Sequence, residues 1–197
     1  MAYIFQQVAD QGRADGITSN DTTEARDWYR NAARDIASVN TTRLMNDKRN
    51  IKPNIVVGDI GKMFMFFYDP KNKDTLPFYD KFPLIFPVDF TKGGFYGINL
   101  HYLAPILRAK LMDALYSTAN NDKYDDSTKL KLSYNLLKGA SKFQYFAPCF
   151  KMYLWDHVQG QFLNVQTQNW DTALMLPTER FAKASRETVW KDSASKV

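Results

Sequence analysis

The sequence contains very few of the side chains that commonly perform chemistry at neutral pH. Its 197 residues include one cysteine, two histidines and three glutamates, against eighteen aspartates. The single Cys149 excludes an internal disulfide framework and, between Pro148 and Phe150, is expected to be a small core residue. His101 is expected to be structural, bonded to a backbone carbonyl. The carboxylates show no spacing suited to a metal ion, so we expect no enzyme, no metal and no other cofactor.

Long apolar runs are missing as well. No stretch approaches 18 consecutive apolar residues, so the sequence predicts no membrane-spanning helix. The N-terminus has no basic region followed by an apolar run, so it does not resemble a secretory signal. We therefore expect a protein that is made and folded in the cytoplasm and has no membrane partner.

Aromatic residues, by contrast, are abundant, and they concentrate in one segment. Residues 61–102 contain twelve phenylalanines and tyrosines and four of the eight prolines, but no cysteine, glutamate or serine and a single histidine. Such a segment can build strands and a shaped surface, but it offers few groups for chemistry. Aromatic side chains are enriched at protein interfaces, although an aromatic core would explain the same composition. The candidate interface residues are Tyr68, Phe78, Tyr79, Phe95 and Tyr96.

Short apolar strands alternate with turns through this segment. Strands are expected at residues 63–68, 84–90 and 95–102, separated by turns rich in Pro, Asn, Asp and Gly. Strands that recur about every ten residues are typical of a small antiparallel barrel or curled sheet. We therefore predict an α+β fold, a helical domain with a small antiparallel β-barrel or curled sheet at about residues 55–102. The expected core residues of this segment are Phe64, Phe66, Leu84, Phe86 and Ile98.

Helical periodicity flanks the aromatic segment, because apolar residues recur there every three or four positions. The expected helices are residues 22–39, 104–116, 128–138 and 178–190. In the first of them, Arg26, Arg30 and Arg34 recur on another face, which we expect to be solvated. A further strand is expected at residues 150–155, with residues 162–165 as its partner across a turn.

The first 22 residues are polar and contain two glycines, so they have little apolar surface with which to fold. We predict an N-terminal arm at residues 1–22 that becomes ordered only against a partner. A single α+β domain would then occupy residues 23–197.

Basic residues gather in the C-terminal half of the chain. The formal net charge is +5, and residues 127–155 contain five lysines and no acidic residue. Lysines interleaved with aromatic residues can bind phosphates and stack on bases. The candidate nucleic-acid contacts are Lys129, Lys138, Lys142 and Lys151. A solvated lysine face over an aromatic core gives the same pattern, and we favour it because arginine, the commoner residue at specific base contacts, is absent from this run.

Several short motifs in and after the aromatic segment follow one another in a recognisable order. They are YDPK at 68–71, LPFYD at 76–80, FPL at 82–84, GFYGINLHYL at 94–103, Pro105, and LR at 107–108 with the helix continuing to Leu115. Together they cover roughly residues 61–116 and resemble a small virion protein of large contractile-tailed phages of the T-even type and of their relatives among marine phages. The resemblance implies a structural protein, either a tail or baseplate component or a DNA-end protector, and it implies no catalytic residue.

Composition and resemblance agree on a virion component made in the host cytoplasm. Our leading hypothesis is a protein that joins neighbouring subunits in the tail or baseplate of a phage, in several copies within a symmetric assembly. The alternative is a DNA-binding virion protein that protects or anchors packaged genome ends. The expected partners are therefore other virion proteins and, in the alternative, nucleic acid.

Overall fold

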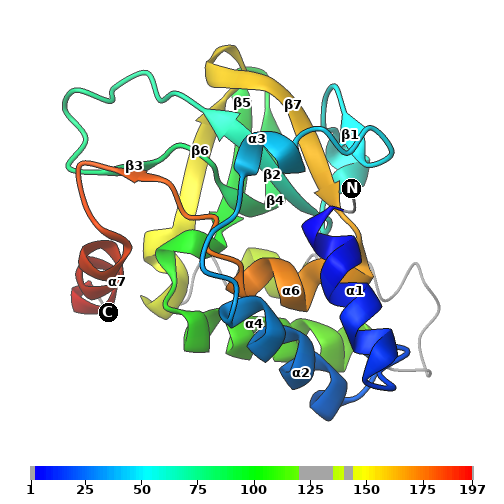
Figure 1. Ribbon diagram of the computed structural model, residues 1–197. Coiled ribbons are helices and arrows are strands. Elements are labelled where there is room, and N and C mark those ends of the chain that lie inside the picture. The colour runs from blue at the N-terminus through cyan, green and yellow to red at the C-terminus, as the bar shows by residue number, and fades with distance from the viewer. Residues whose placement is uncertain (1–2, 120–134, 140–143, 197) are drawn as a thin grey trace.

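The computed structural model describes residues 3–119, 135–139 and 144–196 of the chain. Figure 1 shows two layers, a twisted sheet and a group of helices packed against one of its faces. The helices include α1 (Ile4–Ala14), α2 (Thr23–Arg34), α3 (Thr41–Leu44), α4 (Pro105–Ala119), α6 (Trp170–Met175) and α7 (Arg186–Ser195). The strands are β1 (Ile51–Lys52), β2 (Met63–Tyr68), β3 (Tyr79–Asp80), β4 (Leu84–Thr91), β5 (Gly94–Asn99), β6 (Phe150–Leu154), β7 (Val158–Val165) and β8 (Phe181–Ala182). The predicted α+β class is confirmed.

The main sheet is antiparallel, with strand order β1-β7-β2-β4-β5-β6. Its ends are β1 and β6, so the described strands form an open sheet, and of the two predicted forms, barrel or curled sheet, the described strands do not form a closed barrel. The sheet also extends beyond the predicted segment of residues 55–102. The predicted pairing of the strands at 150–155 and 162–165 is wrong too, because β6 pairs with β5 while β7 pairs with β1 and β2.

A glycine explains why β6 can lie so close to β5. A β-carbon on Gly94 would stand 1.9 Å from the carbonyl oxygen of Tyr153, so only a residue without a side chain fits there. The sequence places Gly93 and Gly94 at what looks like an ordinary turn, and local pattern alone does not show that Gly94 is needed for strand pairing.

The sheet is strongly curled, in agreement with the second of the two predicted forms, a curled sheet. The rings of Phe66 on β2 and Tyr153 on β6 have centroids 5.3 Å apart, although two strands separate β2 from β6. In a flat sheet, strands three positions apart would be separated by about 14 Å, since neighbouring strands lie about 4.8 Å apart. The rings of Phe95 and Phe162, also three strands apart, have centroids separated by 6.0 Å. The concave face therefore encloses an aromatic cluster of its own.

Both faces of the curled sheet are buried. Alternate residues of β2 supply the two cores, since Met63 and Met65 face the helices while Phe64 and Phe66 belong to the aromatic cluster. The core prediction is confirmed by exposed fractions of 0% for all five predicted residues, Phe64, Phe66, Leu84, Phe86 and Ile98. Cys149 is buried as expected, and burial raises the pKa of its thiol to about 12.

A buried ion pair joins the helices that cover the sheet. Arg30 of α2 donates from Nε to Asp171 of α6 at 2.8 Å and from Nη2 to Asp113 of α4 at 2.6 Å. Arg30 and Asp171 are buried, so the predicted solvated arginine face is wrong at Arg30 and also at the buried Arg26. Three helices from distant parts of the sequence meet at one guanidinium group, a contact that periodicity within α2 cannot reveal.

Two helix starts follow the local sequence signals, whereas the helix predicted at residues 22–39 ends early, at Arg34, and the last helix begins late. Thr22 caps α2 by accepting a hydrogen bond from the Ala25 amide at 3.1 Å, and α4 begins at Pro105. The last helix was expected to begin at Thr178, but it begins at Arg186, where Ser185 accepts a bond from the Thr188 amide. The residues before it are extended because Phe181 and Ala182 pair with β3.

The N-terminal residues are folded onto the rest of the chain. Helix α1 occupies Ile4–Ala14, and its Phe5 and Val8 are buried. This packing differs from the expectation of an arm that is ordered only against a partner. The apolar residues of the segment are few, but they lie on one side of a helix and find partners within the same chain. The division of the chain at residue 22 stays a prediction.

We expect Phe66→Ala to lower the free energy of unfolding by about 3–5 kcal/mol, because it removes a ring from the centre of the concave aromatic cluster. Urea denaturation followed by fluorescence measures the change. Val57→Ala is the control, since Val57 is 66% exposed and its truncation should cost no more than about 0.5 kcal/mol. Equal stability of Phe66→Ala and wild type would contradict the core assignment.

Replacing Gly12 by valine should separate α1 from α2. A β-carbon on Gly12 would stand 2.8 Å from the hydroxyl oxygen of Tyr29 and 3.2 Å from the Trp28 ring, so valine forces these side chains of α2 to shift. Limited trypsin digestion of the purified protein should then cut after Arg13 faster than in wild type. The same substitution at Gly58 is the control, because a β-carbon there would meet no atom within 4 Å. Unchanged cleavage of the Gly12→Val protein would contradict the observed helix contact.

Candidate functional site

Aromatic side chains from distant parts of the sequence surround a small cavity beside the end of β2. The cavity has a volume of about 180 Å³ and lies among β2, the loop before β3, the turn after β5, and β6. Its lining residues are Tyr68, Pro70, Leu76, Phe78, Tyr79, Asp80, Asn99, Tyr102, Lys151, Met152 and Tyr153. We refer to it as the aromatic cavity.

One cation lines the aromatic cavity. The ammonium group of Lys151 lies 4.1 Å from the centroid of the Tyr102 ring, the geometry of a cation–π contact. Burial lowers the pKa of Lys151. Among the described residues no carboxylate lies within ion-pair distance of Lys151, and the nearby charge of Asp192 is shared with Lys196. A half-buried cation of this kind is suited to a ligand that carries negative charge.

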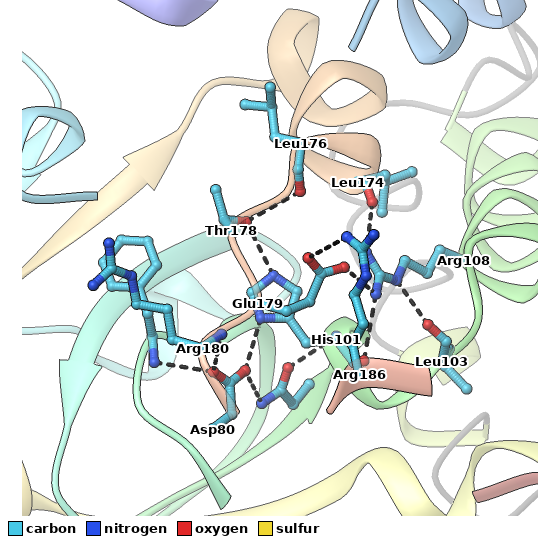
Figure 2. A network of polar contacts seen from close by, with 12 residues as sticks. Asp80, His101, Leu103, Arg108, Leu174, Leu176, Thr178, Glu179, Arg180 and Arg186 are labelled. Carbon is cyan, nitrogen blue, oxygen red and sulfur yellow. Dashed lines mark hydrogen bonds and ion pairs between the residues drawn. The ribbon is translucent and has the colours of Figure 1, made fainter. Parts of the chain in front are cut away.

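A buried hydrogen-bond network, drawn in Figure 2, reaches the aromatic cavity through Asp80 and Asn99, which line it. Asp80 accepts from His101 Nδ1 at 2.7 Å, from Asn99 Nδ2 at 3.1 Å and from the Phe82 amide at 3.0 Å. Burial alone would raise the pKa of Asp80, but the charge of His101 and these hydrogen bonds outweigh burial and hold that pKa below its ordinary value. Asp80 is therefore ionised at neutral pH.

The other nitrogen of His101 reaches the C-terminal segment. His101 Nε2 lies 3.1 Å from Thr178 Oγ1. His101 is thus structural, as predicted, but its side-chain partners are a carboxylate and a hydroxyl and the predicted bond to a backbone carbonyl is wrong. The order carboxylate, imidazole, hydroxyl is that of a hydrolase triad. Thr178 is only 1% exposed, however, so no substrate could reach its hydroxyl in this structure.

A second half of the network surrounds Arg108. Its guanidinium group donates to the carbonyls of Leu103 and Leu174, each at 2.8 Å, and Nη2 lies 2.6 Å from the Glu179 carboxylate. Arg108 and Glu179 also line a second cavity of about 370 Å³, together with Arg34, Arg186 and Trp190. We refer to it as the arginine cavity. Trp190 connects the arginine cavity to the Asp80–His101 half of the network by donating from Nε1 to the His101 carbonyl at 2.9 Å.

A lysine from the C-terminal segment positions one wall of the aromatic cavity. Lys183 Nζ donates to the carbonyls of Lys73, Asp74 and Leu76 at 2.6, 3.0 and 3.0 Å. These bonds fix the loop that leads to Phe78 and Tyr79. The cavity wall is therefore held by a residue more than a hundred positions away in the sequence.

The structure brings together residues that the sequence analysis proposed for two different roles. Tyr68, Phe78 and Tyr79, proposed as interface residues, line the same cavity as Lys151, proposed as a nucleic-acid contact. Phe95 lies fully buried in the aromatic cluster and presents no surface.

The remaining proposed residues lie elsewhere. Tyr96 is outside the cavity and stacks on Phe150 with ring centroids 5.2 Å apart. Lys138 is exposed on the helical segment 135–139, while Lys129 and Lys142 fall outside the described residues.

Sequence reasoning missed Asp80, Asn99, Tyr102 and Tyr153. For Tyr153 a signal existed, since alternation along residues 150–155 places Tyr153 and Lys151 on one face of a strand. For Asp80 none existed, because its hydrogen bonds to His101 and Asn99 join residues about twenty positions apart.

Neither a metal cluster nor a membrane helix occurs in the described ranges. No group of three or more His, Cys, Asp or Glu residues lies together there as metal ligands would. No helix within those ranges is long and apolar enough to cross a bilayer.

Comparison with known proteins identifies a family for this chain. The family model described as phage T4 terminal DNA protecting protein matches residues 9–196, which include both cavities and the network between them. The chain belongs to this family. No curated protein and no solved structure matches it significantly. Membership in the terminal DNA protecting family confirms a phage protein and favours the alternative hypothesis, protection of genome ends, over the joining of subunits in a tail or baseplate.

We expect Asp80→Asn to lower the free energy of unfolding at pH 7 by about 3–5 kcal/mol, because it leaves a buried hydrogen-bond network without its charged acceptor. The folded-state pKa of Asp80 is below its unfolded value, so its stabilisation is fully present above about pH 4 and is lost as pH falls through the folded pKa. Urea denaturation at pH 7 and pH 3 should therefore show a smaller pH effect in the variant.

The exposed Asp156 provides the control, since Asp156→Asn removes the same charge without touching the network. If Asp80→Asn behaves like Asp156→Asn at both pH values, the network does not stabilise the fold.

Proposed function

We propose that this protein binds the ends of linear phage DNA and shields them from exonucleases. The observation that carries the proposal is the match of the terminal DNA protecting family to residues 9–196, nearly the whole chain. The proposed partners are the terminal nucleotides of the genome and the virion proteins that surround them. To shield a DNA end in this way, the protein only has to occupy it. Such binding needs no catalytic group.

The charge of the chain supports DNA as the partner. The net charge of +5 and the sequence pI of about 9.1 favour attraction to a polyanion. The arginine cavity contributes to this attraction, because its three guanidinium groups outnumber its single carboxylate, Glu179. Arginine suits phosphate binding through its planar set of donors.

The arginine cavity is also held in shape. Arg108 and Arg186 lie on the Trp190 ring, 5.4 and 5.7 Å from its centroid. Arg108 is fixed by backbone carbonyls, so its role is to hold the cavity. Arg186 has a side chain that is 47% exposed, and a phosphate would compete there with Glu187, which lies 2.9 Å from Arg186 Nε. We therefore propose that Arg34 and Arg186 contact backbone phosphates.

The test is protection of linear duplex DNA. Purified protein added to an end-labelled linear duplex should slow its digestion by an exonuclease, and should leave the rate of a restriction cut in the interior unchanged. A circular plasmid at equal nucleotide concentration should compete poorly, because it has no ends. Equal affinity for circular and linear DNA, or no protection at saturating protein, would overturn the proposal.

A pair of double variants tests the phosphate contacts. Arg34→Gln with Arg186→Gln should reduce the slope of log affinity against log salt by about two, if each arginine meets one phosphate. Lys48→Gln with Lys92→Gln removes the same charge at exposed positions that line neither cavity, and should change the slope much less. Identical slopes for the two double variants would show that the arginine cavity does not contact DNA.

A further inference from the structure

We infer that the aromatic cavity holds one unstacked base from the end of a DNA strand, with Lys151 facing the adjoining phosphate. The inference rests on the proposed function and names the part of the DNA that the protein would recognise. Four properties of the cavity support it: its size, its free ring, its hydrogen-bond donors and its charge.

The size of the cavity limits the ligand to a single ring system. Pockets for drug-sized ligands measure about 300–1,000 Å³, whereas the aromatic cavity measures about 180 Å³. A duplex cannot enter such a space, and neither can a base that remains stacked between neighbours. One extruded nucleobase is small and flat enough.

Tyr79 offers a ring for stacking. Tyr153 and Tyr102 are largely buried and pack against other rings, Tyr153 against Phe95 and Tyr102 against Phe181. Tyr79 is half-buried and has no ring partner among the described residues. Stacking of bases on exposed aromatic rings is the common mode by which proteins bind unpaired nucleotides.

Two phenol groups can donate hydrogen bonds to a base. Tyr68 Oη accepts from the Leu154 amide at 3.1 Å, and Tyr153 Oη accepts from Asn99 Nδ2 at 3.1 Å. Burial raises the pKa of both phenols, so each keeps its proton at neutral pH. Each hydroxyl can therefore donate to a carbonyl oxygen or ring nitrogen on the edge of a base.

The charge beside the cavity suits a phosphate. Lys151 has no carboxylate partner in the described residues, and Lys196 Nζ lies 6.0 Å from the centroid of the Phe78 ring. Lys196 is paired with Asp192 at 2.6 Å, so two cations face one carboxylate there. A nucleotide supplies a flat ring and a negative charge close together, which matches this arrangement.

A terminal base is the one that can enter most easily. Extruding a base from a duplex costs a few kcal/mol and costs least where the base is already unpaired. A base at a strand end has a stacked neighbour on one side only. A cavity for a single base therefore discriminates between an end and the interior of a duplex without reading sequence.

The experiment uses 2-aminopurine, a fluorescent base whose emission reports stacking. Full-length wild-type protein is mixed with duplexes that carry 2-aminopurine at the terminal or at a central position, and with a duplex whose two ends are closed by hairpins. Fluorescence should change at the terminal position and stay constant at the central position. An equal response at both positions, or at neither, would overturn the inference.

Variants locate the bound base. Tyr79→Ala should weaken binding to duplexes with free ends by roughly 5-fold to 150-fold for the loss of one base–aromatic stack. Lys151→Gln should weaken the same binding by removing a phosphate contact, with a smaller dependence on salt. Both variants should leave binding to the hairpin-closed duplex unchanged. Tyr96→Ala and Lys92→Gln, whose side chains do not line the cavity, are the matched controls. Thermal denaturation identifies any variant that fails to fold, and the wild-type fluorescence result stands without the variants.

The two proposals fail in different ways. If the wild type gives no protection of linear ends, the proposed function is wrong. If it protects ends while Tyr79→Ala and Lys151→Gln protect them equally well, the function stands and the cavity holds something else. Loss of binding to another virion protein in these variants, with DNA binding intact, would assign the cavity to a protein partner and reject the inference.

Discussion

The ionised carboxylate of Asp80 is the group on which the arrangement of the C-terminal half depends. It lies in β3, accepts hydrogen bonds from Asn99 at the end of β5 and from His101 just after it, and through His101 reaches Thr178. A buried charge is costly unless it is paired and fully hydrogen-bonded, so these segments must come together for Asp80 to be accommodated. The same residue lines the aromatic cavity, and the stability of the fold and the shape of the candidate site therefore share one origin.

Two kinds of packing complete the architecture around this network. The concave face of the sheet is filled by rings from five strands, and the curl of the sheet follows from the need to bring those rings into contact. The opposite face is covered by helices that Arg30 joins through Asp113 and Asp171. Apolar packing thus sets the curvature of the sheet, while ion pairs join segments that are distant in the sequence.

The sequence predicted correctly the features that depend on neighbouring residues, such as the bounds of strands and the starts of helices. Alternation and turn residues predicted β2 and β4 nearly to the residue, and Thr22 and Pro105 marked the starts of α2 and α4. Pairing between distant segments was not predictable in this way. Nothing near Phe181 shows that it pairs with β3, and the alternation of residues 150–155 fits an edge beside β5 as well as a hairpin with β7.

The same contrast between local features and distant contacts applies to the candidate site. Tyr68, Phe78, Tyr79 and Lys151 were recognisable by residue type, because aromatic residues and lysines are typical of binding surfaces. Their convergence on one cavity depends on contacts such as those of Lys183, which no periodic pattern encodes. Membership in the terminal DNA protecting family then changed the order of the two functional hypotheses, a change that the residues alone did not support.

The three carbonyl bonds of Lys183 have a consequence for synthesis of the chain. Lys183 lies 110 residues after Lys73, the first carbonyl that it holds. The ribosome therefore produces the aromatic wall long before it produces the residue that fixes that wall in place. A chain that terminates between Tyr153 and Lys183 carries every ring of the cavity and lacks the bonds that fix the wall, so such a product is a poor competitor for whatever the finished protein binds.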